Sequence, residues 1–314
     1  MRIGLDISGG DFAPDATLDG AILAVDELPV STQVVLIGNR EQIANGLIDR
    51  GKNPADFEIV HAPDIIGMGD NPTKAFASKT DSSISVGFRL LKEKQIDAFT
   101  GAGNTGAMLV GAVLSVKPIE GVQRPCIMSL VPKESGKFGI LLDVGSNADC
   151  KPETLVQFAQ LGSTYAETVL GISQPAVGLI NIGEEPEKGN AVTLAAHQLL
   201  KNSGDIHFIG NIEGRDLFND KADVMVCDGF TGNVVLKLME AFYGIYMKSG
   251  VNSEYINRFN YESYGGTPIL GINSTVIVGH GISNANAIKN MIKLAHQVES
   301  ARLTEKIKEI IQHD

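Results

Sequence analysis

Short segments that are almost continuously apolar alternate along this chain with longer amphipathic segments. The apolar segments are rich in Val and Ile and lack the strict in-and-out alternation of a strand with one solvent-facing side. Strands that are apolar on both faces need helices on both sides of their sheet. The pattern therefore predicts an α/β fold with a doubly wound, largely parallel sheet. The predicted strands cover residues 2–7, 33–37, 57–61, 97–100, 126–131, 139–144, 177–182, 207–209 and 223–227.

Helical spacing of apolar residues fills the intervals between these strands. The predicted helices cover residues 15–28, 81–95, 105–116, 153–170, 191–201, 233–248 and 284 to about 311. The last of them places Ile288, Met291, Ile292, Ala295 and Val298 on one stripe, and its charged later turns are expected to project or to cover a subunit contact. No linker or short repeat interrupts the chain. We therefore expect a single α/β catalytic domain over residues 1–314, with two intertwined lobes.

The composition excludes several classes of protein. Hydrophobic residues make up 43% of the chain and charged residues 20%, so a fully disordered chain is excluded. Lys and Arg total 26 against 37 Asp and Glu, and the net charge of -11 argues against binding to nucleic acid. Cys126, Cys150 and Cys227 lie far apart, so neither a disulfide framework nor a metal site is expected. Because no long apolar segment occurs, we expect a cytoplasmic protein.

The 35 glycines concentrate directly after the predicted strands. Carboxyl ends of parallel strands meet at one edge of a sheet, where backbone N–H groups of glycine-rich loops can bind an anion. The same residues also close tight turns, which is the simpler explanation for any one loop. Six such loops favour a shared site. They cover residues 8–11, 101–107, 143–147, 181–189, 228–233 and 279–283.

One loop matches the dinucleotide fingerprint GxGxxG through Gly101, Gly103 and Gly106. The acidic residue that should close the next strand is missing, because Glu120 precedes that strand. We therefore expect no nicotinamide cofactor. Asn104 and Thr105 of this loop are better explained as polar groups aimed at an anion or a carbonyl.

The remaining loops offer single candidates, each with a structural alternative. Lys188 either binds an anion or belongs to a solvated charge run. Asp228 either orients a group in the crevice or accepts turn hydrogen bonds, and Asn233 is expected to cap the following helix. His280, between two glycines, suits proton transfer or phosphate binding, or simply a turn. Cys150 has no visible base partner, so a structural role is preferred to a nucleophilic one.

Nine motifs follow one another in order along nearly the whole chain. They are LDISGGDFAP, KTDSS, GAGNTGA, DVGSNADCKPETLVQFA, VGLINIGEEPEKGN, FIGNIEGRD, ADVMVCDGFTGNVVLK, YGGTPILGINSTVIVGHG and NAIKNMIK. Together they resemble the bacterial phosphate acyltransferases that act on acyl-acyl-carrier-protein (acyl-ACP). The resemblance implies conversion of acyl-ACP and phosphate to acyl phosphate and ACP, upstream of a membrane glycerol-3-phosphate acyltransferase. It also implies a homodimer and a three-layer α/β/α fold similar to isocitrate and isopropylmalate dehydrogenases and to phosphotransacetylase.

Phosphate attack on a thioester needs an anion cradle and donors for the developing oxyanion, and neither a metal nor a cofactor. We expect the amides of residues 103–106, helped by Lys188, to hold the phosphate. Asn147, Asn233 or His280 would then contact the oxyanion or the leaving thiol. The full set of predicted catalytic residues is Asn104, Lys188, Asn147, Asn233 and His280. The full set of predicted binding residues is Gly103, Thr105, Gly106, Asp6, Gly9, Gly10, Asp143 and Asp228.

The chain departs from the family pattern in three places. Ile7 and Ser8 stand where Ala-Met is usual, and Ser146 stands where Ala is usual. Residues 239–264 are shortened in a region that the family uses near its dimer partner and that has been linked to membrane contact. We expect the helical segment 233–262 to lie at that surface, and we favour its apolar side chains as dimer core over a membrane anchor. Peripheral association with the inner face of the membrane is the alternative.

An acidic carrier protein needs a basic docking site on a chain with this net charge. Lys289, Lys293 and Arg258 are the candidates, and ordinary solvated side chains are the alternative for each. Two other functions compete with the one implied by the resemblance. They are a phosphotransacetylase-like enzyme that uses acyl-CoA, and a catalytically silent scaffold for lipid-synthesis enzymes.

Overall fold

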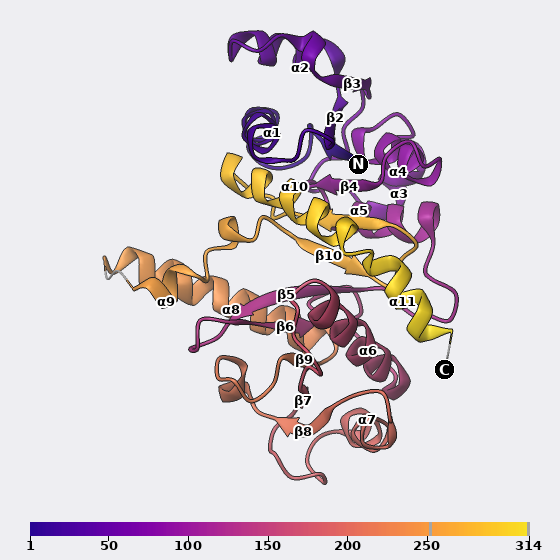
Figure 1. Ribbon diagram of the computed structural model, residues 1–314, viewed down its shortest axis with the longest axis vertical. Coiled ribbons are helices and arrows are strands. Elements are labelled where there is room, and N and C mark those ends of the chain that lie inside the picture. The colour runs from indigo at the N-terminus through magenta and orange to yellow at the C-terminus, as the bar shows by residue number, and fades with distance from the viewer. Residues whose placement is uncertain (251–252, 313–314) are drawn as a thin grey trace. The chain divides into compact units, whose positions relative to one another are not determined.

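The structure, a computed structural model, describes residues 1–250 and 253–312 (Figure 1). The chain forms two compact units, each built from two separate stretches. Unit 1 comprises Met1–Pro118 and Tyr261–Ser300, and unit 2 comprises Ile119–Asn260 and Ala301–Asp314. The expectation of a single domain over residues 1–314 stays a prediction.

The strands of unit 1 pair in parallel except for one antiparallel pair. Its strands are β1 (Arg2–Asp6), β2 (Gln33–Gly38), β3 (Glu58–His61), β4 (Ala98–Gly101), β10 (Thr267–Leu270) and β11 (Thr275–Val278). They lie in the order β3-β2-β1-β4-β11-β10, and only β10 and β11 pair antiparallel. Leu5 of β1 pairs with Leu36 and with Thr100, so the carboxyl ends of β2, β1 and β4 lie at one edge.

Helices cover both faces of this sheet, as a three-layer fold requires (Figure 1). They are α1 (Asp15–Glu27), α2 (Arg40–Asp49), α3 (Pro72–Ser78), α4 (Ser83–Lys92), α5 (Thr105–Gly111) and α10 (Ala285–Ser300). α1 packs against α10, where a Cβ on Gly20 would meet Ile288. α4 packs on the strands, where Gly87 leaves room for the ring of Phe99.

Within its described residues, unit 2 contains five strands. Its strands are β5 (Cys126–Pro132), β6 (Phe138–Leu142), β7 (Val177–Ile180), β8 (Phe208–Ile212) and β9 (Val224–Val226). They lie in the order β5-β6-β9-β7-β8, with β5 and β6 forming an antiparallel hairpin and the other neighbours parallel. Its helices are α6 (Pro152–Thr168), α7 (Ala191–Asn202), α8 (Gly229–Lys248), α9 (Glu254–Asn257), α11 (Leu303–Ile311) and the short 3-10 helix η3 (Gly214–Leu217).

Polar side chains explain where several helices begin. Each accepts a hydrogen bond from a backbone N–H of the first turn, which would otherwise lack a partner. These N-cap residues are Asn39 for α2, Asn71 for α3, Ser82 for α4, Asn104 for α5 and Asp228 for α8. The expectation that Asn233 caps α8 was wrong, because Asp228 accepts the Thr231 N–H at 2.7 Å and Asn233 lies inside the helix.

The predicted last helix, residues 284–311, is in fact two helices. Its apolar stripe in α10 is buried as expected. The helix ends at Ser300, and Arg302 adopts a left-handed conformation with φ of 55° before α11 begins. α11 does not project: Leu303 and Ile307 are buried, and α11 packs on α6 of the same unit. The predicted segment 233–262 contains α8 and α9, while its residues 251 and 252 lie outside the described residues.

Candidate active site

The glycine-rich loops after β1, β4 and β11 converge in unit 1. The Asp11 N–H donates to the Gly281 carbonyl at 2.7 Å. A Cβ on Gly9 would lie only 2.7 Å from the amide nitrogen of Gly103, so only glycine allows this approach. Gly10 has a φ of 109°, which also favours glycine. The structure thus brings Gly9, Gly10 and Gly103 together.

Asp6 ends β1 beneath these loops and is 1% exposed. Its Oδ1 accepts the Ser8 N–H at 3.0 Å, while no hydrogen bond from the described residues reaches its Oδ2. Burial raises the pKa of Asp6 to about 6, against the lowering effect of Ser83 and of the Ser8 and Gly9 amides. Because the carboxyl group is enclosed, it supports the loops from below and does not face solvent.

Asn104 ties two loops of unit 1 together. Its Oδ1 accepts the Ala107 N–H at 3.0 Å. Its Nδ2 donates to the carbonyl oxygens of Gly67 and Asp70, both at 3.1 Å, and lies 3.3 Å from that of Met68. The side chain was expected to face an anion or a carbonyl of the substrate, but both of its N–H groups are used by the loop 67–70. Asn104 therefore acts as a positioning residue.

Three other predicted residues lie around this cluster. Thr105 is exposed at the start of α5, and Gly106 lies against Pro72. His280 is half-buried in a turn whose carbonyl accepts the Ser283 N–H at 3.0 Å. The next residue, Gly281, contacts the Asp11 loop, so His280 belongs to the same group of loops.

A second cluster forms in unit 2 around Asp143, which follows β6 and is fully buried. Its Oδ1 accepts from the Ile127 N–H at 3.0 Å and from the Ser146 hydroxyl at 2.6 Å. Its Oδ2 accepts from the Asn147 N–H at 2.6 Å and from the Asn147 Nδ2 at 3.1 Å. The Ser146 side chain thus adds a donor to this carboxylate.

Asn147, Asp228 and Asn233 belong to this second cluster. Asn147 also donates to the Pro125 carbonyl at 2.8 Å, so both N–H groups of its amide are occupied. Its own carbonyl accepts the Gly229 N–H at 2.8 Å, next to the Asp228 cap of α8. Asn233 donates to the Val144 carbonyl at 3.1 Å and is half-buried. The carboxyl ends of β6 and β9 are held together by these contacts.

Lys188 lies on the exposed loop after β7. Its backbone carbonyl accepts from Asn181 Nδ2 at 3.0 Å, which holds the loop. The neighbouring acid Glu184 pairs with Lys221 at 2.8 Å and with Arg215 at 3.4 Å. In the described part of the chain the Lys188 ammonium has no ion-pair partner, and no contact joins it to the Asp143 cluster.

The predicted docking residues have partners within their own units. In unit 1, Lys289 and Lys293 both pair with Glu27, which holds the pKa of Glu27 below its usual range. In unit 2, Arg258 donates to the carbonyls of Lys133 at 3.1 Å and Lys137 at 2.7 Å. Arg258 thereby braces the β5–β6 hairpin.

The described residues contain neither an activated thiol at Cys150 nor a group of side chains that could hold a metal ion. Cys150 is half-buried, and burial raises its pKa to about 11, which disfavours the thiolate. Among residues 1–250 and 253–312 no group of His, Cys, Asp and Glu side chains is arranged to hold a metal ion. None of the helices described is both long enough and apolar enough to cross a membrane.

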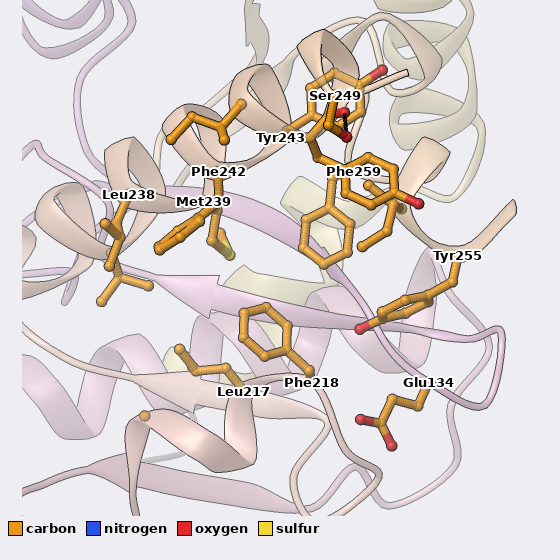
Figure 2. A pocket seen from close by; sticks show the side chains of 15 residues that line it. Glu134, Leu217, Phe218, Leu238, Met239, Phe242, Tyr243, Ser249, Tyr255 and Phe259 are labelled. Atoms are coloured by element: carbon orange, nitrogen blue, oxygen red, sulfur yellow. Dashed lines mark hydrogen bonds between the residues drawn. The ribbon is translucent and has the colours of Figure 1, made fainter. Parts of the chain in front are cut away.

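Unit 2 also contains an apolar pocket of about 760 Å³ that the sequence motifs did not predict. α8 supplies one wall, and Leu217 and Phe218 at the end of η3 face it (Figure 2). The run of Phe242, Tyr243 and Tyr246 was a signal for an apolar surface, but a run on one helix carries no sign of the opposite wall.

Comparison with known proteins finds relatives that match nearly the whole chain. The family model described as "Fatty acid synthesis protein" matches residues 1–306. A phosphate acyltransferase from Syntrophomonas wolfei is 41% identical over 310 residues, which cover 97% of this chain and 97% of the relative. One from Dictyoglomus turgidum is 41% identical over 328 residues, covering 98% of this chain and 97% of the relative.

Solved structures with a similar fold are phosphotransacetylases and related enzymes. A phosphotransacetylase from Streptococcus pyogenes has a TM-score of 0.67 at 16% identity and covers 95% of this chain and 94% of its own. A branched-chain phosphotransacylase from Enterococcus faecalis has a TM-score of 0.64 at 16% identity, with coverage of 95% and 99%. The predicted phosphotransacetylase-like α/β fold is confirmed. With its matches to the family model and to these relatives, the chain belongs to the phosphate acyltransferase family and is an acyltransferase.

Proposed function

We propose that the protein transfers the acyl group of acyl-ACP to inorganic phosphate. A phosphate oxygen attacks the thioester carbonyl carbon, the C–S bond breaks, and the carrier leaves as a thiolate that takes up a proton. The products are acyl phosphate and free ACP. A membrane glycerol-3-phosphate acyltransferase then consumes the acyl phosphate, which places the enzyme in the cytoplasm near the inner face of the membrane.

The convergence of the loops that contain Gly9, Gly103 and Gly281 carries this proposal. Glycine-rich loops at strand ends expose backbone N–H groups, which can donate hydrogen bonds to a phosphate. A site rich in carboxylates would repel this anion. Thr105 offers an exposed hydroxyl beside them, and Lys188 offers a cation with no protein partner in the described residues.

The side chains divide into contacting and positioning groups in this scheme. Lys188, Thr105, Asn233 and His280 contact phosphate, oxyanion or thiol. Asp6, Asn104, Asp143 and Asn147 hold the loops in place, because their polar atoms are enclosed or already bonded within the protein. Neither a metal nor an organic cofactor takes part in the step.

The experiment offers the purified protein acyl-ACP or acyl-CoA together with phosphate and traps acyl phosphate with hydroxylamine. We expect product from acyl-ACP that depends on phosphate. Product from acyl-CoA alone would replace the proposal by a phosphotransacetylase-like reaction. Absence of product from both donors would favour the silent scaffold.

The homodimer is proposed to form through an exposed apolar stripe on α8. Phe230, Val234, Leu238, Phe242 and Ile245 are 53–68% exposed and follow a helical spacing. Such a stripe is costly to leave in water. Light scattering after size exclusion should show a dimer for the wild type and a monomer for Val234→Asp, whereas a monomeric wild type would rule the stripe out.

A further inference from the structure

The apolar pocket of unit 2 is lined by none of the predicted catalytic or binding residues. Met239 and Phe242 of α8 face Leu217 and Phe218 across it (Figure 2). Phe259, just after α9, adds a third aromatic wall. The pocket is thus enclosed on several sides by carbon atoms.

The polar groups of this lining are few. The Tyr255 hydroxyl donates to the Pro132 carbonyl at 3.3 Å, so this hydroxyl already has a partner inside the protein. A volume of about 760 Å³ lies within the roughly 300–1,000 Å³ that small-molecule sites occupy. Water gains few hydrogen bonds in such a space, and an apolar occupant is therefore favoured.

The pocket lies along the same helix that begins at the Asp143 cluster. The Asp228 cap of α8 lies beside Asn147, and Val235 is the first α8 residue of the lining. At about 1.5 Å per residue, Val235 lies roughly 10 Å along the axis from Asp228. The lining continues to Ser249, roughly 20 Å further. An extended ligand with one end near Asp228 would therefore run along α8 into the pocket.

We propose that this pocket binds the hydrocarbon tail of the acyl donor, with the carbonyl end towards Asp228. The inference deepens the proposed function and rests on it, since an acyltransferase handles a substrate with an apolar chain. A second copy of the protein is the competing occupant. The α8 stripe proposed for the dimer shares Leu238, Phe242 and Ile245 with the pocket lining, whereas its Phe230 and Val234 lie outside that lining.

Gly214 allows a test that adds volume without disturbing the fold. It lines the pocket, and a Cβ placed on it meets no atom within 4 Å at a φ that other residues adopt. Gly204 has the same open surroundings and does not line the pocket, so Gly204→Leu is the matched control for Gly214→Leu.

The main measurement is the KM for acyl-ACP donors from octanoyl to octadecanoyl. Each methylene group that the pocket removes from water should lower the dissociation constant by about fourfold. We expect Gly214→Leu to raise the KM for hexadecanoyl-ACP about tenfold or more and to leave that for octanoyl-ACP nearly unchanged. Gly204→Leu should match the wild type at every length. An unchanged chain-length profile for Gly214→Leu, with a shifted monomer–dimer equilibrium, would assign the pocket to a second copy instead.

Direct binding separates this inference from the proposed function. The chain contains no Trp, so its own fluorescence interferes little with the fluorescent fatty acid cis-parinaric acid. Displacement of this probe by longer fatty acids, weakened in Gly214→Leu, supports the pocket even if no donor yields acyl phosphate. Failure of the probe to bind the wild type would overturn the inference while leaving phosphate-dependent turnover intact.

Discussion

Asp6 in unit 1 and Asp143 in unit 2 occupy the same kind of position, at the carboxyl end of a strand and beside a glycine-rich loop, yet their oxygens have different hydrogen-bond partners. Asp143 accepts hydrogen bonds on both oxygens from Ile127, Ser146 and Asn147. Asp6 Oδ2 accepts no hydrogen bond from the part of the chain that the structure describes, and burial raises the pKa of Asp6 to about 6. The Asp6 carboxyl group can therefore take up a proton near pH 6.

Asp143→Ala should have the largest effect in this comparison. The substitution removes the acceptor of the Ser146 hydroxyl and of two Asn147 N–H groups, while the Ile127 N–H keeps its hydrogen bond to Ser146 Oγ at 3.0 Å. At 1–3 kcal/mol per unsatisfied group, we expect a loss of about 3–5 kcal/mol in the free energy of unfolding. Guanidinium denaturation measures it. Asp143→Asn, which keeps an acceptor oxygen, should lose less, and equal losses for the two variants would contradict the hydrogen-bond explanation.

Asp6→Asn should remove a pH dependence of stability. Burial raises the pKa of Asp6 from 3.8 to about 6, so the folded protein holds this proton more tightly than the unfolded chain. As pH rises from about 4 to 6, the free energy of unfolding of the wild type should fall by about 3 kcal/mol relative to that of the variant. Urea denaturation across this range measures the difference. A difference that stays constant over the window would mean that the carboxyl group is ionised throughout.

Lys188→Ala tests whether the Lys188 ammonium takes part in phosphate binding. Removing the cation should raise the KM for phosphate about tenfold, equivalent to about 1.4 kcal/mol, and leave the KM for the acyl donor unchanged. Lys201→Ala, at an exposed lysine in the last turn of α7, is the control. Steady-state kinetics that give both variants wild-type constants would remove Lys188 from the site.

Ser146→Ala should have the smallest effect and restores the residue that is usual in the family. It removes the 2.6 Å hydrogen bond to Asp143 but leaves the other donors in place. The free energy of unfolding should fall by about 1 kcal/mol. If thermal denaturation shows no change, the Ser146 hydroxyl adds nothing to the stabilisation of Asp143.

Local patterns were enough to find most strands and the loops that follow them. Cys126–Pro132 and Gln33–Gly38 match their predicted ranges closely because continuous apolar runs are visible in any short window. α2 was missed because its residues show little apolar periodicity, and its start depends on the Asn39 cap. The break at Arg302 was missed because a single left-handed residue leaves the apolar stripe on either side intact.

The structure shows what the predicted site residues contact, and their roles stay predictions. Asn104 and Asn147 lie at strand ends as expected, but their amides bond protein carbonyls in place of a substrate. Lys289 and Lys293 are on one helix face, as their spacing indicates, while Glu27, far away in sequence, neutralises part of their charge. A spacing rule shows which side chains share a face and cannot show what lies opposite.

The sequence by itself determined the α/β class, the parallel strands and the glycine-rich loops at their ends, because apolar periodicity and glycine placement act over a few residues. Only the tertiary structure decided which partner each polar group found. The donors of Asp143, the loop that takes the Asn104 amide and the wall opposite α8 all come from other segments of the chain. Such partners meet only when the whole unit folds, since hydrogen bonds and packing depend on distance in space.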